Sequence, residues 1–246
     1  HPKHRRRQRQ MCIRDRTLIE NAAREPEIVD IVDMLTKMGA NISGAGTSEI
    51  IIEGVERLKP TNHEVIGDRV AAGTFLAAIF STRGSGKVIG INPEHLPMEI
   101  KKFKEMGAII DLKEDSISIE YDEGINSIEL ATLPFPGVAT DLQPIFGSSL
   151  LQAEGTSILT ENVYDQRFQW IPEVQRMGAN IQTGWQHAMI KGVRNLSGAP
   201  VQATDIRTGA SLIIAALQAD GISSISGVDH INRGYENIVD LSLIHI

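Results

Sequence analysis

The chain has 246 residues, a formal net charge of −7 and 41% hydrophobic residues, which are ordinary values for a globular protein. No apolar run approaches the roughly 20 residues that a membrane-spanning helix needs. Residues 1–16 carry seven basic side chains and one acidic one, so their net charge is 7 − 1 = +6 and that of the remainder is −7 − 6 = −13. Such an acidic body repels nucleic acid, and an anionic ligand would have to be held by locally placed arginines.

The two ends of the chain lack the patterning of the rest. Residues 1–16 show neither helical nor strand periodicity and contain Cys12, the only cysteine. A basic nucleic-acid-binding arm is one interpretation of this leader. We favour a foreign or disordered leader at 1–16 and a foreign tail at 241–246. A single cysteine excludes an intramolecular disulfide and fits a reducing compartment.

From Thr17 onward, hydrophobic periodicity and turn residues predict a regular order of helices and strands. A helix begins at 25–27, where proline and acidic side chains favour a helix start, and a strand follows at 49–53. A second module begins near Val65, with helices at 70–80 and from 93 and strands at 87–91, 108–112 and 116–121. The third has strand 127–133, a helix from Asp141, strand 156–160, helix 171–177 and strands 180–183 and 188–191. The fourth has a strand at Val201, helix 205–219, strand 222–226 and a helix near Gly234.

A Met-Gly-Ala sequence recurs at residues 38–40, 106–108 and 177–179 and ends an amphipathic helix each time. The separations of 106 − 38 = 68 and 177 − 106 = 71 residues exceed the periods of roughly 20–50 residues that mark helical solenoids. We therefore predict an α/β (α+β) fold built from repeated β-α-β-α-β-β modules. Residues 17–54 supply only the second half of one.

Two candidate ligand sites, a phosphate-binding loop and a zinc site, lack the residue spacing that each requires. Residues 83–87 (RGSGK) lack the first glycine and the Ser or Thr of a phosphate-binding loop, and they precede a strand, so we interpret them as a turn. The histidines of the predicted modules lack the close spacings of a zinc site. No metal site is therefore predicted.

Aspartates and arginines recur near the predicted helix starts. Asp68, Asp141 and Asp205 open the first helix of their modules, where an aspartate caps free backbone N–H groups. Because all three share this position, spacing alone does not single out a catalytic one.

Four arginines lie where an anion could bind. Arg69 and Arg207 occupy first helical turns, where a cation opposes the helix dipole, and Arg167 and Arg233 precede second helices. A solvated surface charge is the alternative for any single one. Together, beside helix N-termini, they indicate a site for a small anionic ligand.

Five segments resemble the UDP-N-acetylglucosamine 1-carboxyvinyltransferase family of enolpyruvyl transferases, in order over about residues 17–240. They are Thr17 to Glu27 (TLIENAAREPE), Asp68 to Phe75 (DRVAAGTF), Pro136 to Phe146 (PGVATDLQPIF), Leu196 to Ser211 (LSGAPVQATDIRTGAS) and Ile231 to Glu236 (INRGYE). The resemblance implies transfer of an enolpyruvyl group from phosphoenolpyruvate to the 3-hydroxyl of UDP-N-acetylglucosamine, with release of phosphate. This is the first committed step of bacterial peptidoglycan synthesis, in the cytoplasm.

The family's fold is an inside-out α/β barrel in two domains, each of three β-α-β-α-β-β units, with substrates between the domains. By this resemblance, residues 17–66 are the end of the first domain and residues 67–240 are most of the second. No cofactor, metal, nucleic acid, membrane or obligate protein partner is implied; the ligands are the two substrates.

The resemblance also assigns site residues. Asp141 matches the carboxylate that contacts the sugar hydroxyl and serves as its base, and Arg233 matches an arginine that grips phosphoenolpyruvate. Val163 matches a nucleotide-sugar contact. Arg167 and Arg207 match further charged residues that line the cleft, as do Asp205 and Arg69. The family's Lys-Asn pair and its loop with a cysteine proton donor match nothing in this chain, because Cys12 immediately precedes the Thr17 motif.

Two other functions remain open. One is that of the sister enzyme of aromatic biosynthesis, 5-enolpyruvylshikimate-3-phosphate synthase, although the motifs at 68–75 and 231–236 favour the sugar-nucleotide family. The other is a non-catalytic binding module of the same fold, against which the presence of Asp141, Arg207 and Arg233 argues.

Because the segments that carry the proton donor have no match, we predict that this chain alone has no transferase activity. The test incubates the chain with phosphoenolpyruvate and UDP-N-acetylglucosamine and measures phosphate. Release above an enzyme-free blank contradicts the prediction.

Overall fold

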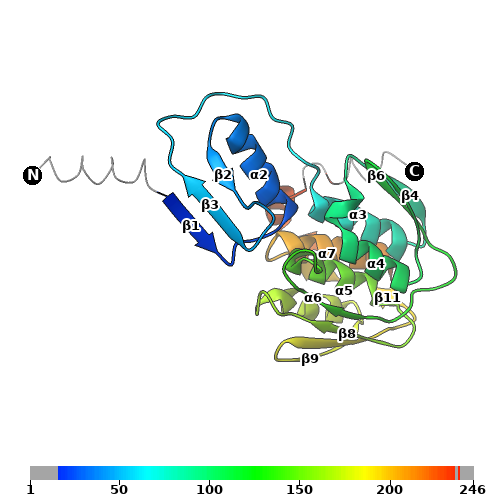
Figure 1. The fold of residues 1–246 in the computed structure, drawn as a ribbon. Helices are drawn as coiled ribbons and strands as arrows, with labels where there is room; N and C mark the ends of the chain where they lie inside the picture. The colour runs from blue at the N-terminus through cyan, green and yellow to red at the C-terminus, as the bar shows by residue number, and fades with distance from the viewer. Residues whose placement is uncertain (1–15, 236–237, 239–246) are drawn as a thin grey trace, which may run out of the picture. The chain divides into compact units, whose positions relative to one another are not determined.

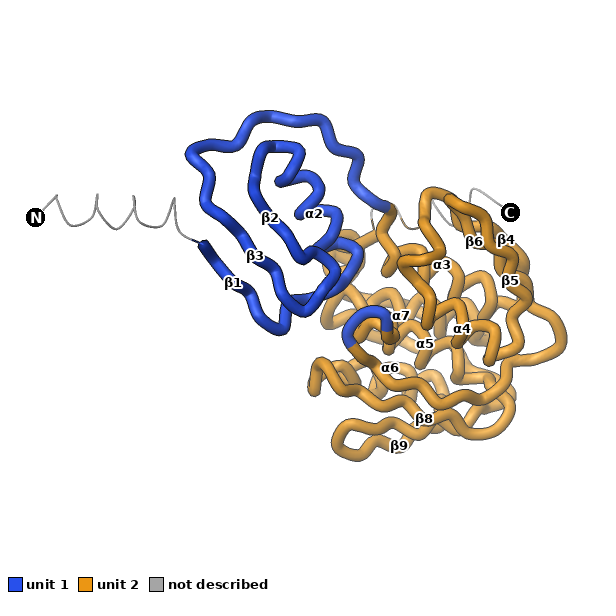
Figure 2. The backbone as a smooth tube through the Cα atoms, viewed as in Figure 1, with its two compact units in different colours: residues 1–66, 134–136 blue, residues 67–133, 137–246 orange. Residues whose placement is uncertain are grey.

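The computed structural model describes residues 16–235 and residue 238. Contacts within the chain divide it into two compact units (Figure 2). Of the described residues, unit 1 takes 16–66 with 134–136, and unit 2 takes 67–133 and those from 137 onward. Cys12 and the predicted tail lie outside the described residues. The assignment of 17–66 and 67–240 to two enolpyruvyl transferase domains stays a prediction.

Unit 1 holds one helix and a three-stranded antiparallel sheet of order β1-β3-β2 (Figure 1). Its elements are β1 (Arg16–Glu20), α2 (Pro26–Lys37), β2 (Asn41–Ser43) and β3 (Glu49–Glu53). The predicted helix start and the predicted strand 49–53 are confirmed. Strand β1 was not predicted, and it begins at Arg16, the last residue of the predicted leader, which pairs with Glu53.

The first part of unit 2 repeats this pattern after an additional helix. Its elements are α3 (Arg69–Ser81), β4 (Ser85–Ile89), η1 (Pro93–His95), α4 (Pro97–Glu105), β5 (Ile109–Lys113) and β6 (Ser116–Glu120). The sheet has the order β4-β6-β5 and is antiparallel. No strand is described at 54–68. Residues 83–84 turn into β4, as predicted, but that strand begins before its predicted start.

The second part of unit 2 is a complete β-α-β-α-β-β module. Its elements are β7 (Glu129–Ala131), η2 (Thr140–Leu142), α5 (Gln143–Ser149), β8 (Thr156–Thr160), η3 (Arg167–Trp170), α6 (Ile171–Arg176), β9 (Asn180–Gly184) and β10 (His187–Lys191). The sheet has the order β7-β8-β10-β9, with β7 parallel to β8. The predicted repeat is confirmed for this module.

A last part begins a further module with short strands. Its elements are β11 (Leu196–Ser197), β12 (Pro200–Gln202), α7 (Ile206–Leu217), β13 (Ala219–Asp220), β14 (Ser224–Ser226) and α8 (Val228–Asn232). β12 and β14 are parallel, as are β11 and β13. Helix α7 ends at Leu217, before its predicted end, because Ala219 pairs with Leu196. The helix predicted near Gly234 falls largely outside the described residues, and α8 was not predicted.

The helices occupy the middle of unit 2 and its sheets lie outside them (Figure 1). Every residue of α5 is buried, and most of α3 and α7 are buried too. Two glycines permit the close packing: a Cβ on Gly73 would lie 2.8 Å from Leu142, and one on Gly147 would lie 2.3 Å from Trp170. No helix of the described residues is long and apolar enough to cross a membrane.

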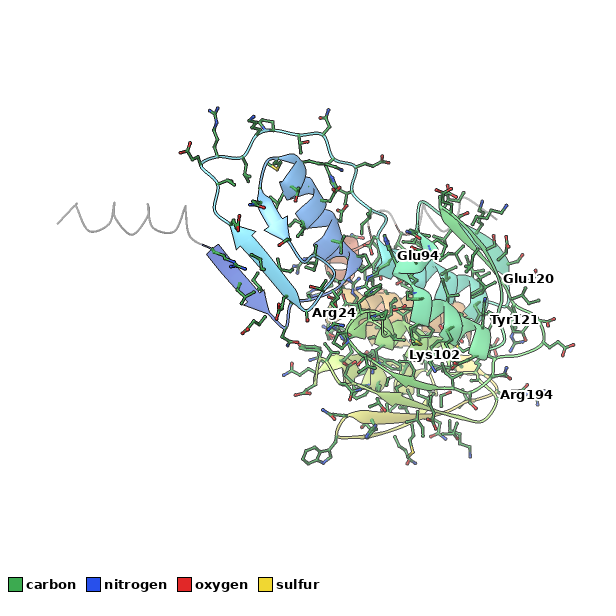
Figure 3. The ribbon with its side chains drawn as sticks, in the orientation of Figure 1. Arg24, Glu94, Lys102, Glu120, Tyr121 and Arg194 are labelled. Atoms are coloured by element: carbon green, nitrogen blue, oxygen red, sulfur yellow. The ribbon has the colours of Figure 1, made fainter. Side chains whose placement is uncertain are left out.

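Polar side chains join neighbouring parts of unit 2. Lys102 is labelled in Figure 3. Its amino group pairs with Glu105 at 2.6 Å and donates to the backbone carbonyl of Glu129 at 2.8 Å. This lysine therefore connects α4 to β7.

The three Met-Gly-Ala sequences all form the same helix end. In the third, Gly178 donates to Gln175 O at 3.0 Å and Ala179 donates to Val174 O at 3.2 Å. These two bonds are the Schellman motif, and the glycine takes the left-handed conformation with φ +94°. Gly39 and Gly107 have φ +99° and +103° with the equivalent bonds, so the predicted glycine stop is confirmed in all three copies.

The methionine carbonyl of each copy also receives a bond from the start of the next segment. The donors are the N–H groups of Lys59, Asn126 and Ser197, at 2.8, 2.9 and 2.8 Å from the carbonyls of Met38, Met106 and Met177. The donor follows its methionine at an almost constant sequence separation (59 − 38 = 21, 126 − 106 = 20 and 197 − 177 = 20). Each helix end therefore fixes the chain that leaves its module.

We predict that Gly178→Ala destabilises the chain by about 1 kcal/mol, because an alanine Cβ is strained at positive φ. Nothing lies within 4 Å of a Cβ at this position, so steric contact adds no cost. Denaturant unfolding measures the change. Gly184→Ala is the control, since Gly184 also has open space but lacks a positive φ. Equal effects of the two substitutions would contradict the prediction.

Candidate functional site

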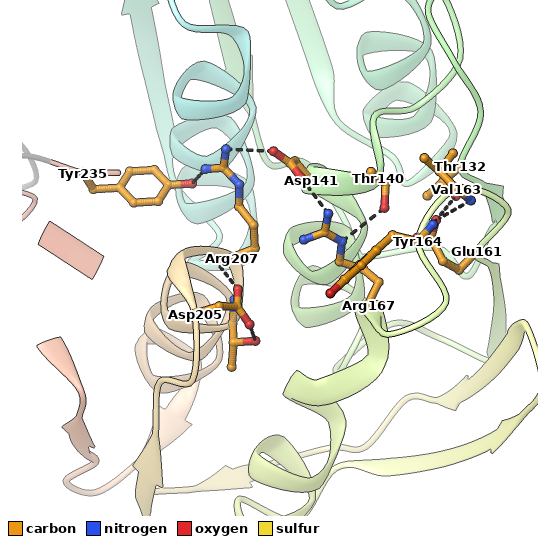
Figure 4. A network of polar contacts seen from close by, with 11 residues as sticks. Thr132, Thr140, Asp141, Glu161, Val163, Tyr164, Arg167, Asp205, Arg207 and Tyr235 are labelled. Atoms are coloured by element: carbon orange, nitrogen blue, oxygen red, sulfur yellow. Dashed lines mark hydrogen bonds and ion pairs between the residues drawn. The ribbon is translucent and has the colours of Figure 1, made fainter. Parts of the chain in front are cut away.

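The carboxylate of Asp141 lies between two arginines (Figure 4). The Arg167 Nη2 atom donates to Asp141 Oδ1 at 2.8 Å, and Arg207 Nη2 donates to Asp141 Oδ2 at 2.8 Å. The three side chains come from η2, η3 and α7, and they are 35%, 15% and 20% exposed in the order Asp141, Arg167, Arg207. The structure thus brings together three of the predicted site residues, which are far apart in the sequence.

The prediction that Asp141 caps a helix is wrong. Asp68 and Asp205 do cap α3 and α7, each accepting two backbone N–H groups. Asp141 instead lies inside η2, whose N-cap residue is Ala139 and whose start is capped by no side chain. Helix α5 starts later, with Pro144 in its first turn. Proline has no N–H group to cap, so the Asp141 carboxylate is available to the two arginines.

Each arginine has a second contact that fixes its direction. Arg167 Nε donates to Thr140 Oγ1 at 3.1 Å, and its guanidinium carbon lies 4.8 Å from the centre of the Tyr164 ring. Arg207 Nη1 lies 3.4 Å from the Tyr235 hydroxyl. A guanidinium stacked on an aromatic ring keeps its planar donor edge directed. The two cations are therefore held in place from both sides.

Tyr235 joins the arginine cluster to α3. Its buried hydroxyl lies 2.8 Å from Thr74 Oγ1. Burial raises the pKa of Tyr235 despite its hydrogen bond with Thr74 and the charge of Arg207, so the phenol stays neutral. Burial alone would lower the pKa of Arg207, but the charge and hydrogen bond of Asp141 together with the interaction with Tyr235 outweigh this effect, and the net pKa is raised. Arg207 is accordingly a permanent cation.

Asp205 is both a helix cap and a neighbour of the cluster. Its Oδ1 accepts the N–H groups of Arg207 and Thr208 at 2.8 and 3.0 Å, and its Oδ2 accepts the Thr208 hydroxyl at 2.6 Å. Burial raises the pKa of Asp205, but these hydrogen bonds and the charge of Arg167 outweigh it. The net pKa is below the ordinary 3.8.

The other predicted site residues lie at separate places. Val163 is 50% exposed and its N–H donates to Glu161 Oε1 at 2.9 Å. Arg69 is buried in the first turn of α3, and Arg233 is exposed at the C-terminal end of α8. Within the described part of the chain, Asp141 forms ion pairs with Arg167 and Arg207. In that part it forms none with Arg233, and Val163 has no charge to contribute.

Glu99 supports the turn that carries Asp141. Its Oε1 accepts the Ala139 N–H at 3.1 Å, while its side chain is only 1% exposed. Burial raises the pKa of Glu99; the hydrogen bond from Ala139 and the charge of Arg69 lower it only in part. This carboxyl group therefore holds the N-terminal end of η2.

Sequence reasoning missed the residues that orient the cluster, namely Thr140, Tyr164, Tyr235, Glu99 and Glu161. Thr140 and Tyr235 lie within segments that carried the resemblance, and Tyr164 is the neighbour of the predicted residue Val163. Nothing local in the sequence distinguishes Glu99 from a surface glutamate, because its partner Ala139 is 40 residues away.

The arrangement suits deprotonation of a neutral hydroxyl beside an anion. A carboxylate has about four lone-pair sites, and the two arginines occupy one on each oxygen, so Asp141 can still accept a hydroxyl proton. The remaining guanidinium N–H groups can bind anionic oxygens in a directed way. Among the described residues, no group of three or more His, Cys, Asp or Glu side chains could hold a metal ion.

The family model that matches this chain and two of its curated relatives all carry the name of a carboxyvinyltransferase. The family model for EPSP synthase (3-phosphoshikimate 1-carboxyvinyltransferase) matches residues 10–241. The UDP-N-acetylglucosamine 1-carboxyvinyltransferases of Thermotoga maritima and Nocardia farcinica are both 47% identical to this chain, over 92% and 91% of it. The chain spans about half of those relatives, 53% of each.

Solved structures show the same fold. The enolpyruvyl transferase NikO from Streptomyces tendae superposes with a TM-score of 0.82 at 24% identity, over 92% of this chain and 55% of that one. EPSP synthase from Acinetobacter baumannii superposes with a TM-score of 0.73 at 21% identity, over 93% and 56%. The chain thus has the enolpyruvyl transferase fold, with mixed α/β structure and small sheets.

We predict that the Asp205 carboxyl titrates below 3.8 in the folded chain. Because its pKa is lowered on folding, the stability it contributes is present above the unfolded value and is lost as pH falls through the folded value. Carbon-13 NMR of the side-chain carboxyl measures the midpoint. Thr208→Val removes one hydrogen bond and should raise the midpoint; a wild-type midpoint at or above 3.8 contradicts the prediction.

Proposed function

The chain belongs to the EPSP synthase family, and on this premise we propose that the whole protein is an enolpyruvyl transferase acting on UDP-N-acetylglucosamine. It moves the enolpyruvyl group of phosphoenolpyruvate to the sugar 3-hydroxyl and releases phosphate. The relatives that are 47% identical bear the name of this reaction. The structural observation that carries the proposal is the Asp141 carboxylate held between Arg167 and Arg207.

In the proposed reaction, Asp141 accepts the proton of the sugar hydroxyl. The hydroxyl oxygen then bonds to the central carbon of phosphoenolpyruvate, and the methylene carbon gains a proton, which gives a tetrahedral adduct. Loss of one methyl proton and of the phosphate restores the double bond. By the family resemblance, the donor of the proton to the methylene carbon lies in a segment that matches nothing in this chain.

Arg167 and Arg207 serve this chemistry through position and charge. They fix the carboxylate in one direction, which lowers the entropic cost of proton transfer. Their fixed positive charge also stabilises anionic oxygens without reorganisation during the reaction. Desolvation beside a bound substrate strengthens both effects, because the effective dielectric falls.

The remaining roles follow the family pattern. We propose that Arg233 grips phosphoenolpyruvate, that Val163 contacts the nucleotide sugar, and that Asp205 and Arg69 line the same cleft. The complete domain would close as an inside-out α/β barrel. The protein would act in the bacterial cytoplasm in peptidoglycan synthesis, without a cofactor, nucleic acid or obligate protein partner.

A second candidate acceptor is shikimate 3-phosphate. It is favoured by the name of the family model and by the fold shared with the A. baumannii EPSP synthase. That enzyme is 21% identical to this chain, against 47% for the sugar-nucleotide enzymes. The sugar nucleotide is therefore the preferred acceptor.

We predict that UDP-N-acetylglucosamine raises the melting temperature of the full-length protein and that shikimate 3-phosphate leaves it unchanged. A ligand at 100 times its dissociation constant stabilises the folded state by about 2.7 kcal/mol. Differential scanning fluorimetry measures both ligands at equal concentrations. Protection by shikimate 3-phosphate alone would reverse the assignment, and protection by neither would overturn it.

Asp141→Asn in the full-length protein separates binding from chemistry. It removes the proton acceptor and keeps a side chain of similar shape, so we expect kcat to fall by about 10²–10⁴-fold. Protection by UDP-N-acetylglucosamine should persist. An unchanged kcat contradicts the role of Asp141 as the base.

A further inference from the structure

Glu161 is a buried carboxylate that the proposed reaction does not use. It follows strand β8 directly and is 1% exposed. Its Oε1 accepts three hydrogen bonds: from Thr132 Oγ1 at 2.7 Å, from the Val163 N–H at 2.9 Å and from the Tyr164 N–H at 3.0 Å (Figure 4). One oxygen of Glu161 thus binds the Thr132 side chain, just beyond β7, and the backbone N–H groups of Val163 and Tyr164 in the loop that follows β8.

Thr132 completes a polar cluster on the inner side of this loop. Its hydroxyl oxygen accepts the Asn162 N–H at 3.0 Å, and its carbonyl accepts the Asn162 side-chain amide at 3.1 Å. The Thr132 N–H in turn donates to Thr160 O at 2.9 Å. Thr132, Glu161 and Asn162 therefore fasten the ends of the parallel strands β7 and β8 to each other.

The position of Glu161 is energetically expensive. Its second oxygen, Oε2, is buried without a hydrogen-bond partner among the described residues. A buried carboxylate costs free energy unless hydrogen bonds compensate it. Hydrogen bonds to an ionised acceptor are roughly twice as strong as neutral ones. The hydrogen bonds of Glu161 hold the backbone N–H groups of Val163 and Tyr164 in place.

That fixation reaches the site through Tyr164. The Tyr164 carbonyl accepts the Arg167 N–H at 3.0 Å, and the Tyr164 ring lies against the Arg167 guanidinium, 4.8 Å away. Arg167 then holds Asp141 at 2.8 Å. The side chains of Val163 and Tyr164 are about half exposed, so the outer side of the loop offers little packing. The bonds to Glu161 anchor its inner side.

We propose that Glu161 is a positioning residue, which fixes the loop at 163–167 so that Tyr164 directs the Arg167 guanidinium onto Asp141. It contacts neither substrate nor the reacting atoms, and it acts through Arg167. The catalytic meaning of this role rests on the proposed function, but the positioning itself is a property of the chain without ligand. The test can therefore be made without a substrate.

The experiment compares Glu161→Ala and Glu161→Gln with the wild-type chain by nitrogen-15 NMR. The readouts are the hydrogen-exchange rates of the Val163 and Tyr164 amides and the signal of Arg167 Nε–H, which is bonded to Thr140. In Glu161→Ala we expect both amides to exchange about 10- to 100-fold faster, the range for losing a hydrogen bond to a charged group, and the Arg167 signal to broaden or shift. Glu161→Gln keeps an acceptor oxygen and should restore most of the protection.

Glu173→Gln is the matched control. Glu173 is also a largely buried carboxylate that accepts one backbone N–H, that of Gln202 at 2.8 Å, but it lies outside the cluster. This variant should leave Arg167 unchanged. If Glu161→Ala does not fold, Thr132→Val tests the same cluster, because it removes the hydroxyl donor at nearly constant volume. In that case Thr132→Val, in place of Glu161→Ala, should broaden or shift the Arg167 Nε–H signal.

The proposal is overturned if the Val163 and Tyr164 amides open while the Arg167 signal keeps its wild-type position. It is also overturned if exchange rises equally throughout the chain, since Glu161 is then a general stability residue. If the Arg167 signal moves as expected but UDP-N-acetylglucosamine does not protect the full-length protein, the positioning role stands and the proposed function fails. In the full-length enzyme, Glu161→Ala should lower kcat, because the Arg167 contact that directs Asp141 is disturbed, and Glu161→Gln should restore most of it.

Discussion

One carboxylate shared by two guanidinium groups is the interaction on which the candidate site depends. The like charges of Arg167 and Arg207 repel each other, and the Asp141 carboxylate between them forms an ion pair of 2.8 Å with each. The pairs are partly shielded from water, so salt screens them less than it screens surface pairs. Because η2, η3 and α7 each supply one partner, this single anion sets how the starts of three helical segments converge.

Around this anion, three further carboxyl groups accept hydrogen bonds from backbone N–H groups. Glu99 holds the N–H that begins η2, and Asp205 holds the first turn of α7. Glu161 holds the loop before η3. Each of the three segments that carry a charged site residue is thus fastened at its start by one carboxyl group. A site assembled from short turns needs such fastening, since a turn has few hydrogen bonds of its own.

Local signals predicted much of the fold, and contacts between distant residues account for what was missed. Asp68, Asp205 and the Met-Gly-Ala glycines act within a few residues of themselves, so the helices that they begin or end were placed correctly. Strand β1 exists because it pairs with β3, although α2 and β2 come between them in the sequence, and its first residue looks like part of the basic leader. Asp141 has the same spacing as the capping aspartates. What distinguishes it is Arg207, 66 residues away. The resemblance supplied the family, and the structure supplied the grouping of Asp141, Arg167 and Arg207.

The bond from each methionine carbonyl to the start of the following segment has a consequence for how such chains can be recombined. It makes the outgoing chain part of the module that it leaves, up to Lys59, Asn126 or Ser197. A chimera that exchanges modules at Met-Gly-Ala would therefore separate the carbonyl from its donor, while a junction placed just after the donor keeps both together. The natural seam between repeats thus lies downstream of the most visible repeat signature.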